Sequence, residues 1–224
     1  MATGTRKEVR LKTPVTADEL EPLELGDVVY LDGHVYTARE GVYKRVLDEG
    51  HSLPEGLTAL TNVSFHCSPA ASVNDDGTFN IGAVTATASF RFGKWMPKWF
   101  DVSKCRLILG KGGMTEEDYR EVFLPNGARY LTTVGYGTGA LLGRGIREVE
   151  AVHWLEDLGI AQAIWVLRIE KFGPFLVESD GEGRSLFEQH NKRLNQRIEG
   201  LYEGLKPPAL SRYGESDDRR DELI

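Results

Sequence analysis

Cysteine is scarce in this sequence, because Cys67 and Cys105 are the only two among 224 residues. Two cysteines make neither a disulfide framework nor, by themselves, a zinc or iron–sulfur site. The five histidines are scattered without metal-ligand spacing, so we assign no metal-ligating residue to this chain. No apolar run approaches the roughly 18 residues of a membrane span, and the first residues lack the apolar core of a signal peptide. A cytoplasmic location is therefore expected.

Basic residues are outnumbered as well, with 27 Lys and Arg against 34 Asp and Glu and a formal net charge of -7. This balance argues against nucleic acid or an anionic membrane as the main partner, because both attract positive charge. Hydrophobic residues at 41% and charged residues at 27% are typical of a soluble globular protein with one substantial core. We expect an N-terminal arm over residues 1–22, one domain over residues 23–206 and a disordered charged tail over residues 207–224.

Strand and helix signals are mixed along the central domain, which indicates an α/β fold. Residues 27–37 contain two β-rich runs around an Asp-Gly pair, and this pattern predicts a hairpin. Residues 105–109 are apolar and followed by glycine, which predicts a buried strand. Apolar residues recur at helical spacing over residues 186–205, which predicts an amphipathic C-terminal helix that ends at Pro207.

Residues 80–114 carry the pattern with the most chemical content. Thr87 and Ser89 come just before Arg91, and a planar guanidinium group near hydroxyl groups suits bidentate capture of a carboxylate. A short apolar strand then leads to Lys111, which lies between glycines that allow a sharp turn and a close backbone approach. Because ligands of open α/β sheets collect at such strand-to-helix turns, we predict a small-anion site here. The alternative is a glycine-rich turn with a solvated lysine.

Three other segments carry weaker signals. Arg39 lies in the first turn of a predicted helix, where a cation opposes the helix dipole, so it serves either function or simple surface exposure. His66 at a strand end is interpreted as a hydrogen-bonded structural residue. The sequence GYGTG at residues 135–139 lacks the full spacing and the distant acid of a dinucleotide loop. It is expected to serve close packing, or to start a helix whose amides face a carboxylate.

Taken together, these segments resemble the β subunit, or C-terminal domain, of the class I iron–sulfur hydro-lyases, the fumarase and L(+)-tartrate dehydratase family. The resemblance covers roughly residues 9–188. It is carried by the order and spacing of RLKTP at residues 10–14, GDVVYL at 26–31, YTAR at 36–39, the Thr-x-Ser-x-Arg element at 87–91, GKGGM at 110–114, and Gly159 with Ala163-Ile164-Trp165.

This resemblance implies a swivelling β/β/α domain with a mixed sheet that closes over a [4Fe–4S] cluster, which cysteines of a separate α subunit ligate. It also implies a small dicarboxylate substrate and an α2β2 hetero-oligomer. In the family, an arginine, a threonine, a second arginine and a lysine of these motifs reach the substrate. They correspond here to Arg39, Thr87, Arg91 and Lys111. The three cations, with Ser89, are expected to bind the carboxylates, and Thr87 is the candidate for proton transfer.

Two segments depart from the family pattern. The sequence TATASFRF at residues 85–92 stands where the family has Gly-Pro-Thr-Thr before the small residue and Arg-Met after it. REGVY at residues 39–43 stands where the family has Arg-Asp-Ala-Ala-His. We therefore expect a pocket that is larger or more apolar than that of a fumarase. Hydration of fumarate to malate is the predicted reaction. The alternatives are an L(+)-tartrate or methylfumarate (mesaconate) dehydratase or hydratase subunit, and a non-catalytic binding or assembly module.

Overall fold

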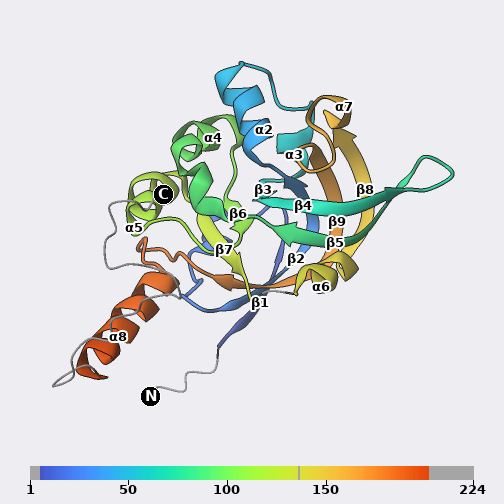
Figure 1. Cartoon of the computed structure of the whole chain (residues 1–224). Helices are drawn as coiled ribbons and strands as arrows, with labels where there is room; N and C mark the ends of the chain where they lie inside the picture. Colours follow the sequence, from blue (N-terminus) through green and yellow to red (C-terminus); the bar gives the residue numbers. More distant parts are fainter. Residues whose placement is uncertain (1–5, 136, 202–224) are drawn as a thin grey trace, which may run out of the picture. The chain divides into compact units, whose positions relative to one another are not determined.

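The computed structural model describes residues 6–135 and 137–201, and its centre is a mixed sheet that closes on itself (Figure 1). The sheet consists of β1 (Glu8–Lys12), β2 (Val28–Thr37), β3 (Val63–Phe65), β6 (Leu107–Gly110), β7 (Arg129–Thr133), β8 (Ile146–His153) and β9 (Ile164–Val177). These seven strands pair in the order β1-β2-β3-β6-β7-β9-β8, and β2 pairs with β9 as well. The five strands from β2 to β9 in this order therefore form a closed barrel.

The strand directions explain where the helices lie. β2, β3, β6 and β7 run parallel to one another, whereas β9 runs antiparallel to both β2 and β7. Parallel neighbours require long crossover connections, and short helices occupy these connections. The helices are α1 (Ala17–Leu20), α2 (Glu40–Tyr43), α3 (Leu57–Leu60), α4 (Met96–Ser103), α5 (Glu116–Asp118), α6 (Gly139–Arg144), α7 (Leu155–Leu158) and α8 (Leu186–Leu201). Short π-helical or 3-10 segments cover residues 44–48, 89–95, 119–123 and 124–126.

Two apolar clusters use opposite faces of the same strands. In β6, Leu107 and Leu109 belong to one cluster and Ile108 to the other. In β7, Leu131 and Tyr130 divide in the same way. This division follows from the period of two along a strand, and it requires the strands to be apolar on both faces. The first cluster receives residues from every barrel strand, and the second adds aromatic residues from α2 and α4. The buried strand predicted at residues 105–109 is present as β6, which begins at Leu107 and ends at Gly110.

The hairpin predicted around Asp32 and Gly33 is wrong, because β2 runs through both residues as one strand. Its register against β9 shifts at this point, which marks a bulge instead of a turn. The bulge is caused by Thr13, which lies 20 positions before Gly33 in the sequence. The Thr13 hydroxyl accepts a hydrogen bond from the His34 amide at 2.6 Å and donates to the His34 carbonyl at 2.7 Å. Gly33 has φ 104°, and a Cβ there would lie 2.5 Å from Thr13 Oγ1.

Both ends of the predicted domain differ in detail from the expectation. The segment expected to be an arm contains β1, which pairs in parallel with β2, and α1, which begins with a capping box between Thr16 and Glu19. At the other end, α8 starts where the helix was predicted, and the predicted stop at Pro207 and the charged tail lie outside the described residues. One compact unit extends to Gln189, and a second begins at His190. No helix in the described part of the chain is long and apolar enough to cross a membrane.

A two-stranded antiparallel hairpin of β4 (Cys67–Val73) and β5 (Phe79–Ala86) extends from the barrel (Figure 1). Its two strands are joined by a turn in which the Gly77 amide donates to the Asn74 carbonyl at 2.9 Å. Helix α6 packs on β5 through two glycines. A Cβ on Gly139 would lie 2.6 Å from the Val84 carbonyl oxygen, and a Cβ on Gly143 would overlap the Gly82 carbonyl oxygen. Gly139 therefore allows α6 to pack closely on β5, as expected for the GYGTG sequence at residues 135–139. Tyr136 of that sequence lies outside the described residues.

The α6–β5 contact yields a stability prediction. Gly143→Ala should lower the free energy of unfolding by about 1–3 kcal/mol, because the new methyl group meets backbone atoms that cannot rotate away. Gly82→Ala is the matched control, since nothing lies within 4 Å of its Cβ position. Urea denaturation measures both. Equal stability of the two variants would contradict the packing described here, particularly as alanine favours a helix more than glycine does.

Candidate active site at one edge of the barrel

The segment beginning at Thr87 lies beside Lys111. The Lys111 amide donates to the Thr87 carbonyl at 3.2 Å, and the Ser89 amide donates to the Lys111 carbonyl at 3.2 Å. Ala88 and Lys111 form an isolated parallel bridge between them. On its other side, the Thr87 amide donates to the His66 carbonyl at 2.6 Å. Residues far apart in sequence, which were predicted to form one anion site, are therefore brought together between the ends of β3 and β6.

Arg39 reaches the same edge through the strand register. Thr37 of β2 pairs with Phe65 of β3, which pairs with Leu109 of β6. Because these strands are parallel, their carboxyl ends meet at one edge of the sheet. Arg39 follows Thr37 by two residues, and Lys111 follows Leu109 by two residues, so both lie just beyond the ends of their strands. The structure thus places one cation after β2 and another after β6 at the same end of the barrel.

Arg39 is half-buried and held in place. It precedes the first turn of α2 in an extended backbone conformation, so its side chain does not lie on the helix surface. Its Nη1 donates to the Ala161 carbonyl at 2.9 Å, while its buried Nε has no hydrogen-bond partner within the described residues. Burial, and then repulsion from the nearby Arg91, lowers the pKa of Arg39 from its usual value. Two guanidinium groups close enough to repel each other form a site that an anion would stabilise.

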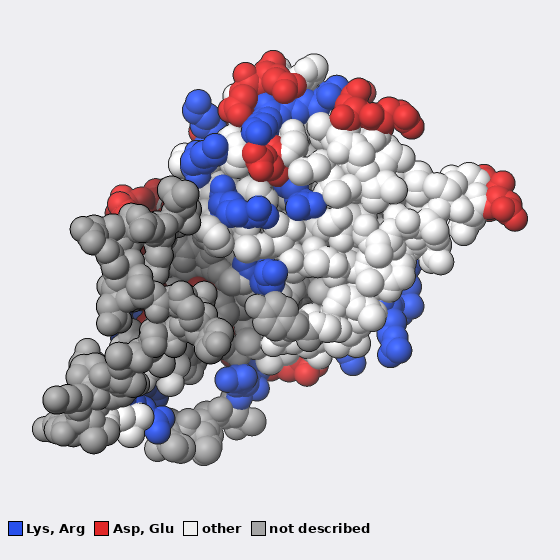
Figure 2. Space-filling model, viewed as in Figure 1, with Lys and Arg blue, Asp and Glu red and all other residues white. Residues whose placement is uncertain are grey.

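Arg91 is exposed and lies near the charged side chains of Arg39 and Glu40. It lies in the 3-10 turn Ser89–Trp95, and its guanidinium carbon is 5.6 Å from the centroid of the Phe92 ring. The ion pair with Lys44 holds the pKa of the neighbouring Glu40 below its usual value, and Lys94 and Arg91 contribute to that shift. Figure 2 shows Lys and Arg side chains over α2 and α4 and near the end of β6, with Asp and Glu side chains among them over α2, beside a broad area with little charge over β4 and β5.

Ser89 was expected to contact substrate, but its side chain is 0% exposed and faces the protein interior. The physical reason is Gly110, whose missing Cβ leaves the space that the Ser89 hydroxyl occupies. Ser89 Oγ lies 2.7 Å from His66 Nδ1, and it accepts a hydrogen bond from the Tyr130 hydroxyl at 2.6 Å. The hydroxyl group is therefore already engaged inside the protein.

The interpretation of His66 as a hydrogen-bonded structural residue is confirmed. It is fully buried, and its Nε2 lies 2.6 Å from the hydroxyl oxygen of Tyr43. Burial lowers the pKa of His66 to about 3, so the ring is neutral at ordinary pH. Sequence reasoning missed Tyr43 and Tyr130 as partners in this arrangement. Tyr43 could have been noticed, because it stands where the family motif Arg-Asp-Ala-Ala-His has histidine. The sequence around Tyr130 contains no comparable signal.

The glycines after Lys111 form the sharp turn that the sequence predicts, with φ 70° at Gly112. Their close approach is to a buried carboxyl group. A Cβ on Gly113 would lie 2.6 Å from Glu178 Oε1 and 2.9 Å from the Tyr119 hydroxyl oxygen. The amide that follows, that of Met114, donates to the Tyr119 hydroxyl at 2.8 Å. The loop that carries Lys111 thus rests on side chains of the second half of the chain.

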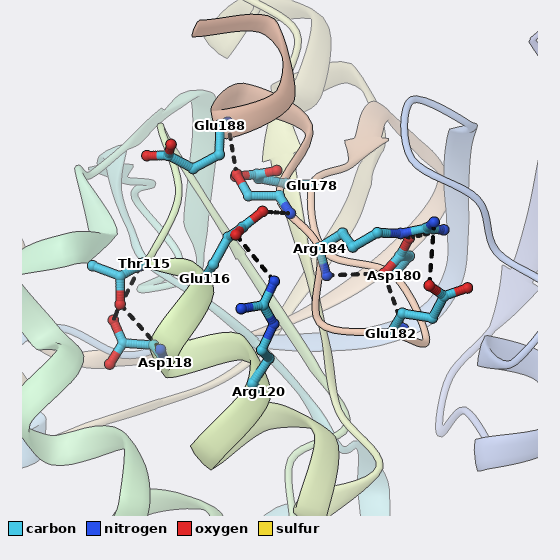
Figure 3. Close-up of polar contacts among 10 residues, drawn as sticks. Thr115, Glu116, Asp118, Arg120, Glu178, Asp180, Glu182, Arg184 and Glu188 are labelled. Carbon is cyan, nitrogen blue, oxygen red and sulfur yellow. Dashed lines mark hydrogen bonds and ion pairs between the residues drawn. The ribbon is translucent and has the colours of Figure 1, made fainter. Parts of the chain in front are cut away.

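Glu178 lies beneath the loop that carries Lys111, and nothing in the sequence predicts a role for it. Its carboxyl group accepts hydrogen bonds from the Ser185 hydroxyl and the Leu186 amide, both at 2.7 Å. Ser185 in turn accepts from the Glu188 amide at 3.1 Å, so Glu178 lies at the start of α8 (Figure 3). Burial raises the pKa of Glu178 to about 7, because these donors do not replace the water that a carboxylate loses.

Lys111 also lines a pocket of about 360 Å³ between β5 and the start of α6. Thr85 and Ala86 line it from β5, and Thr138 and Gly139 line it from the start of α6. The mixture of a cation, hydroxyl groups and small apolar side chains suits a small organic anion. The alternative of a solvated lysine in a plain turn is less consistent with this position at a concave surface.

The residues of this chain do not fit a [4Fe–4S] cluster. Cys67 and Cys105 are both buried, and burial raises the pKa of the Cys67 thiol above its usual value and that of Cys105 to about 11. Cys105 Sγ lies 2.9 Å from the Tyr36 hydroxyl oxygen, inside the second apolar cluster. Across residues 6–135 and 137–201, no three His, Cys, Asp or Glu side chains come together to hold a metal ion.

The Glu178 environment yields a pH prediction. Its folded-state pKa of about 7 lies above the ordinary glutamate pKa of 4.5, so the stabilising contribution is complete below pH 4.5 and is lost as pH rises through 7. A shift of this size corresponds to about 3 kcal/mol. Relative to Glu178→Gln, which does not ionise, the wild type should lose roughly that much unfolding free energy between pH 4.5 and 8. Urea denaturation across this range measures the difference.

Glu116→Gln is the control for removal of a negative charge near α8. Its carboxylate contacts the Ser185 amide at 3.3 Å and forms an ion pair with Arg120 at 3.1 Å (Figure 3). This variant should keep the wild-type decline of stability with pH. Parallel stability curves for the wild type and Glu178→Gln would show that the buried carboxyl group is not the source of the pH dependence.

Comparison with known proteins agrees with the motif pattern. The model of the Fumarase C-terminus family matches residues 1–190. The chain is 29% identical over 203 residues to "L(+)-tartrate dehydratase subunit beta" of Escherichia coli, covering 87% of this chain and 94% of that protein. It is 30% identical over 190 residues to "Putative L(+)-tartrate dehydratase subunit beta" of Methanocaldococcus jannaschii, covering 84% of this chain and 95% of that protein. It is 30% identical over 193 residues to "Putative fumarate hydratase class I" of Geobacillus stearothermophilus, covering 86% of this chain and 36% of that protein. The chain therefore belongs to the Fumarase C-terminus family, which confirms the resemblance of its motifs to the β subunit or C-terminal domain of class I hydro-lyases.

Proposed function

We propose that this chain is the β subunit of a hydro-lyase that reversibly adds water to fumarate to give malate. The observation that carries the proposal is the common edge of Arg39, Arg91 and Lys111, with the Thr87 backbone bonded to Lys111. A dicarboxylate brings two negative groups, and this edge offers three cationic side chains. A guanidinium group binds a carboxylate through two parallel hydrogen bonds, which fixes its orientation as well as its charge.

The reaction assigns a different task to each type of side chain. Removal of the proton on the carbon next to a carboxylate moves negative charge onto that carboxylate, in the aci form. Arg39, Arg91 and Lys111 bind the carboxylates and stabilise this charge in the transition state. Thr87 moves the carbon-bound proton, accepting it during dehydration and returning it during hydration. A threonine hydroxyl is a poor base, so the nearby cations must lower its pKa for this task.

The partner in this proposal is an α subunit that carries the [4Fe–4S] cluster, in a cytoplasmic α2β2 hetero-oligomer. The cluster would supply the Lewis acid that binds the substrate hydroxyl group. Two features support a cluster on another chain: the buried state of Cys67 and Cys105, and the word "beta" in the names of two relatives. Swivelling of this domain over the α subunit, which the family resemblance implies, belongs to the same proposal.

Dehydration of L(+)-tartrate is the second candidate reaction. It is favoured by the names of the Escherichia coli and Methanocaldococcus jannaschii relatives, of which the chain covers 94% and 95%. The relative named for fumarate hydratase supports the first candidate, although the chain matches 36% of its length. Both substrates are four-carbon dicarboxylates, so the same three cations would serve either one.

The test is an anaerobic pull-down of the tagged chain from its own cells. The recovered material is assayed for hydration of fumarate, hydration of mesaconate and dehydration of L(+)-tartrate. A brown complex with a second, cysteine-bearing chain and activity on one substrate supports the proposal and names that substrate. A colourless chain recovered alone, and inactive on all three, would instead favour a non-catalytic binding or assembly module.

Thr87 gives the most specific kinetic prediction. In the active complex, Thr87→Ala should lower kcat by about a hundredfold or more, because proton transfer typically contributes that much. KM should change by less than about threefold, since the carboxylates remain bound to the cations. Thr87→Ser, which keeps the hydroxyl group, should retain most of the rate. Thr58→Ala, at an exposed position of α3, is the matched control. An unchanged kcat in Thr87→Ala would remove Thr87 from the mechanism.

A further inference from the structure

Four buried side chains form a continuous chain of hydrogen bonds beneath the proposed site. Tyr130 donates to Ser89 Oγ at 2.6 Å, Ser89 Oγ lies 2.7 Å from His66 Nδ1, and His66 Nε2 lies 2.6 Å from the Tyr43 hydroxyl oxygen. All four residues are 0% exposed. We call Tyr43, His66, Ser89 and Tyr130 the Ser89 network. Its members come from four segments that are distant in the sequence.

The polar groups of the Ser89 network satisfy one another. Because burial keeps His66 neutral, one ring nitrogen donates and the other accepts. In the first arrangement, the Tyr43 hydroxyl donates to His66 Nε2 and His66 Nδ1 donates to Ser89 Oγ. The Ser89 hydroxyl then donates to the Thr87 carbonyl oxygen, 3.5 Å from Ser89 Oγ. If Ser89 donates to Nδ1, then Nε2 donates to Tyr43. Only the first arrangement accounts for every proton of the network with these hydrogen bonds. A fully bonded buried network holds its members in one geometry.

Each end of the network is attached to a residue of the proposed site. At one end, the Tyr43 amide donates to the Arg39 carbonyl at 3.1 Å, so a shift of Tyr43 displaces the first turn of α2 and with it Arg39. At the other end, the Ser89 amide donates to the Lys111 carbonyl at 3.2 Å, and the Tyr130 hydroxyl lies 3.4 Å from the same oxygen. The network therefore links the cation after β2 to the cation after β6.

We propose that the four members of the Ser89 network are positioning residues that set the separation between Arg39 and Lys111, and thereby fit the site to a short dicarboxylate. The inference rests on the proposed function for its substrate class. It changes the expected role of Ser89 from substrate contact to support of the residues that make the contact. A binding group that is misplaced by about 1 Å can lower the reaction rate by about a hundredfold. Residues that hold Arg39 and Lys111 in position therefore affect catalysis.

Ser89→Ala tests the proposal, with Ser103→Ala as the matched control. Ser103 is also a fully buried serine with two hydrogen bonds, to the Trp99 carbonyl at 2.7 Å and from the Cys105 amide at 3.2 Å, but it is no member of the network. In the complex with the α subunit, Ser89→Ala should lower kcat/KM for the four-carbon substrate by about tenfold to a hundredfold. Ser103→Ala should leave kcat/KM unchanged although it loses buried hydrogen bonds as well.

A second readout on the isolated chain does not depend on activity. In nitrogen-15 spectra, Ser89→Ala should shift both the Arg39 side-chain Nε signal and the Lys111 amide signal, whereas Ser103→Ala should shift neither. A folded Ser89→Ala variant whose Arg39 and Lys111 signals match the wild type would overturn the proposal. If the wild-type complex hydrates or dehydrates none of the dicarboxylates, the proposed function fails, and these spectra alone decide the positioning role.

Tyr43→Phe keeps the proposal testable if Ser89→Ala does not fold. This substitution removes one hydroxyl group and preserves the ring that packs on Trp95 and Trp99. It should displace the Lys111 amide signal, even though Lys111 belongs to the far end of the network. A Lys111 signal that stays at its wild-type position in Tyr43→Phe would show that the network does not couple the two cations.

Discussion

Parallel pairing of β2, β3 and β6 is the constraint on which the site depends. The register aligns Thr37, Phe65 and Leu109, so the residues that follow them emerge at one edge of the barrel. Arg39 and Lys111 take their positions from this alignment. β9 closes the barrel by pairing with both β2 and β7, which leaves the central parallel strands no free edge along which to slip.

Local chemistry was enough to predict the elements that depend on neighbours in sequence. The apolar run before Gly110 forms β6, as its composition predicts. Where a distant residue decides the geometry, the local signal was wrong or absent. The Asp-Gly pair at residues 32–33 is the strongest short-range hairpin signal, yet the Thr13 hydroxyl holds that segment as a bulged strand.

The candidate site divides in the same way. Arg39, Thr87, Arg91 and Lys111 could be predicted as site residues because their motifs are contiguous and chemically distinctive. Ser89 belongs to the same motif, but its burial depends on the space left at Gly110 and on two partners, His66 just after β3 and Tyr130 in β7. No local pattern reports such contacts. Glu178 was missed for a similar reason: it is one acidic residue among 34 Asp and Glu, and only the fold shows that it is buried beneath the Lys111 loop.

The central claim is that this chain binds the carboxylates of a small substrate while a partner supplies the remaining groups. A crystal structure of the anaerobically purified complex with bound L-malate or L(+)-tartrate tests it most directly. The account predicts substrate carboxylate oxygens within hydrogen-bond distance of Arg39, Arg91 and Lys111, and cluster ligands that come entirely from the other chain. A substrate held wholly by the partner, or a cluster bound to Cys67 or Cys105, would contradict it.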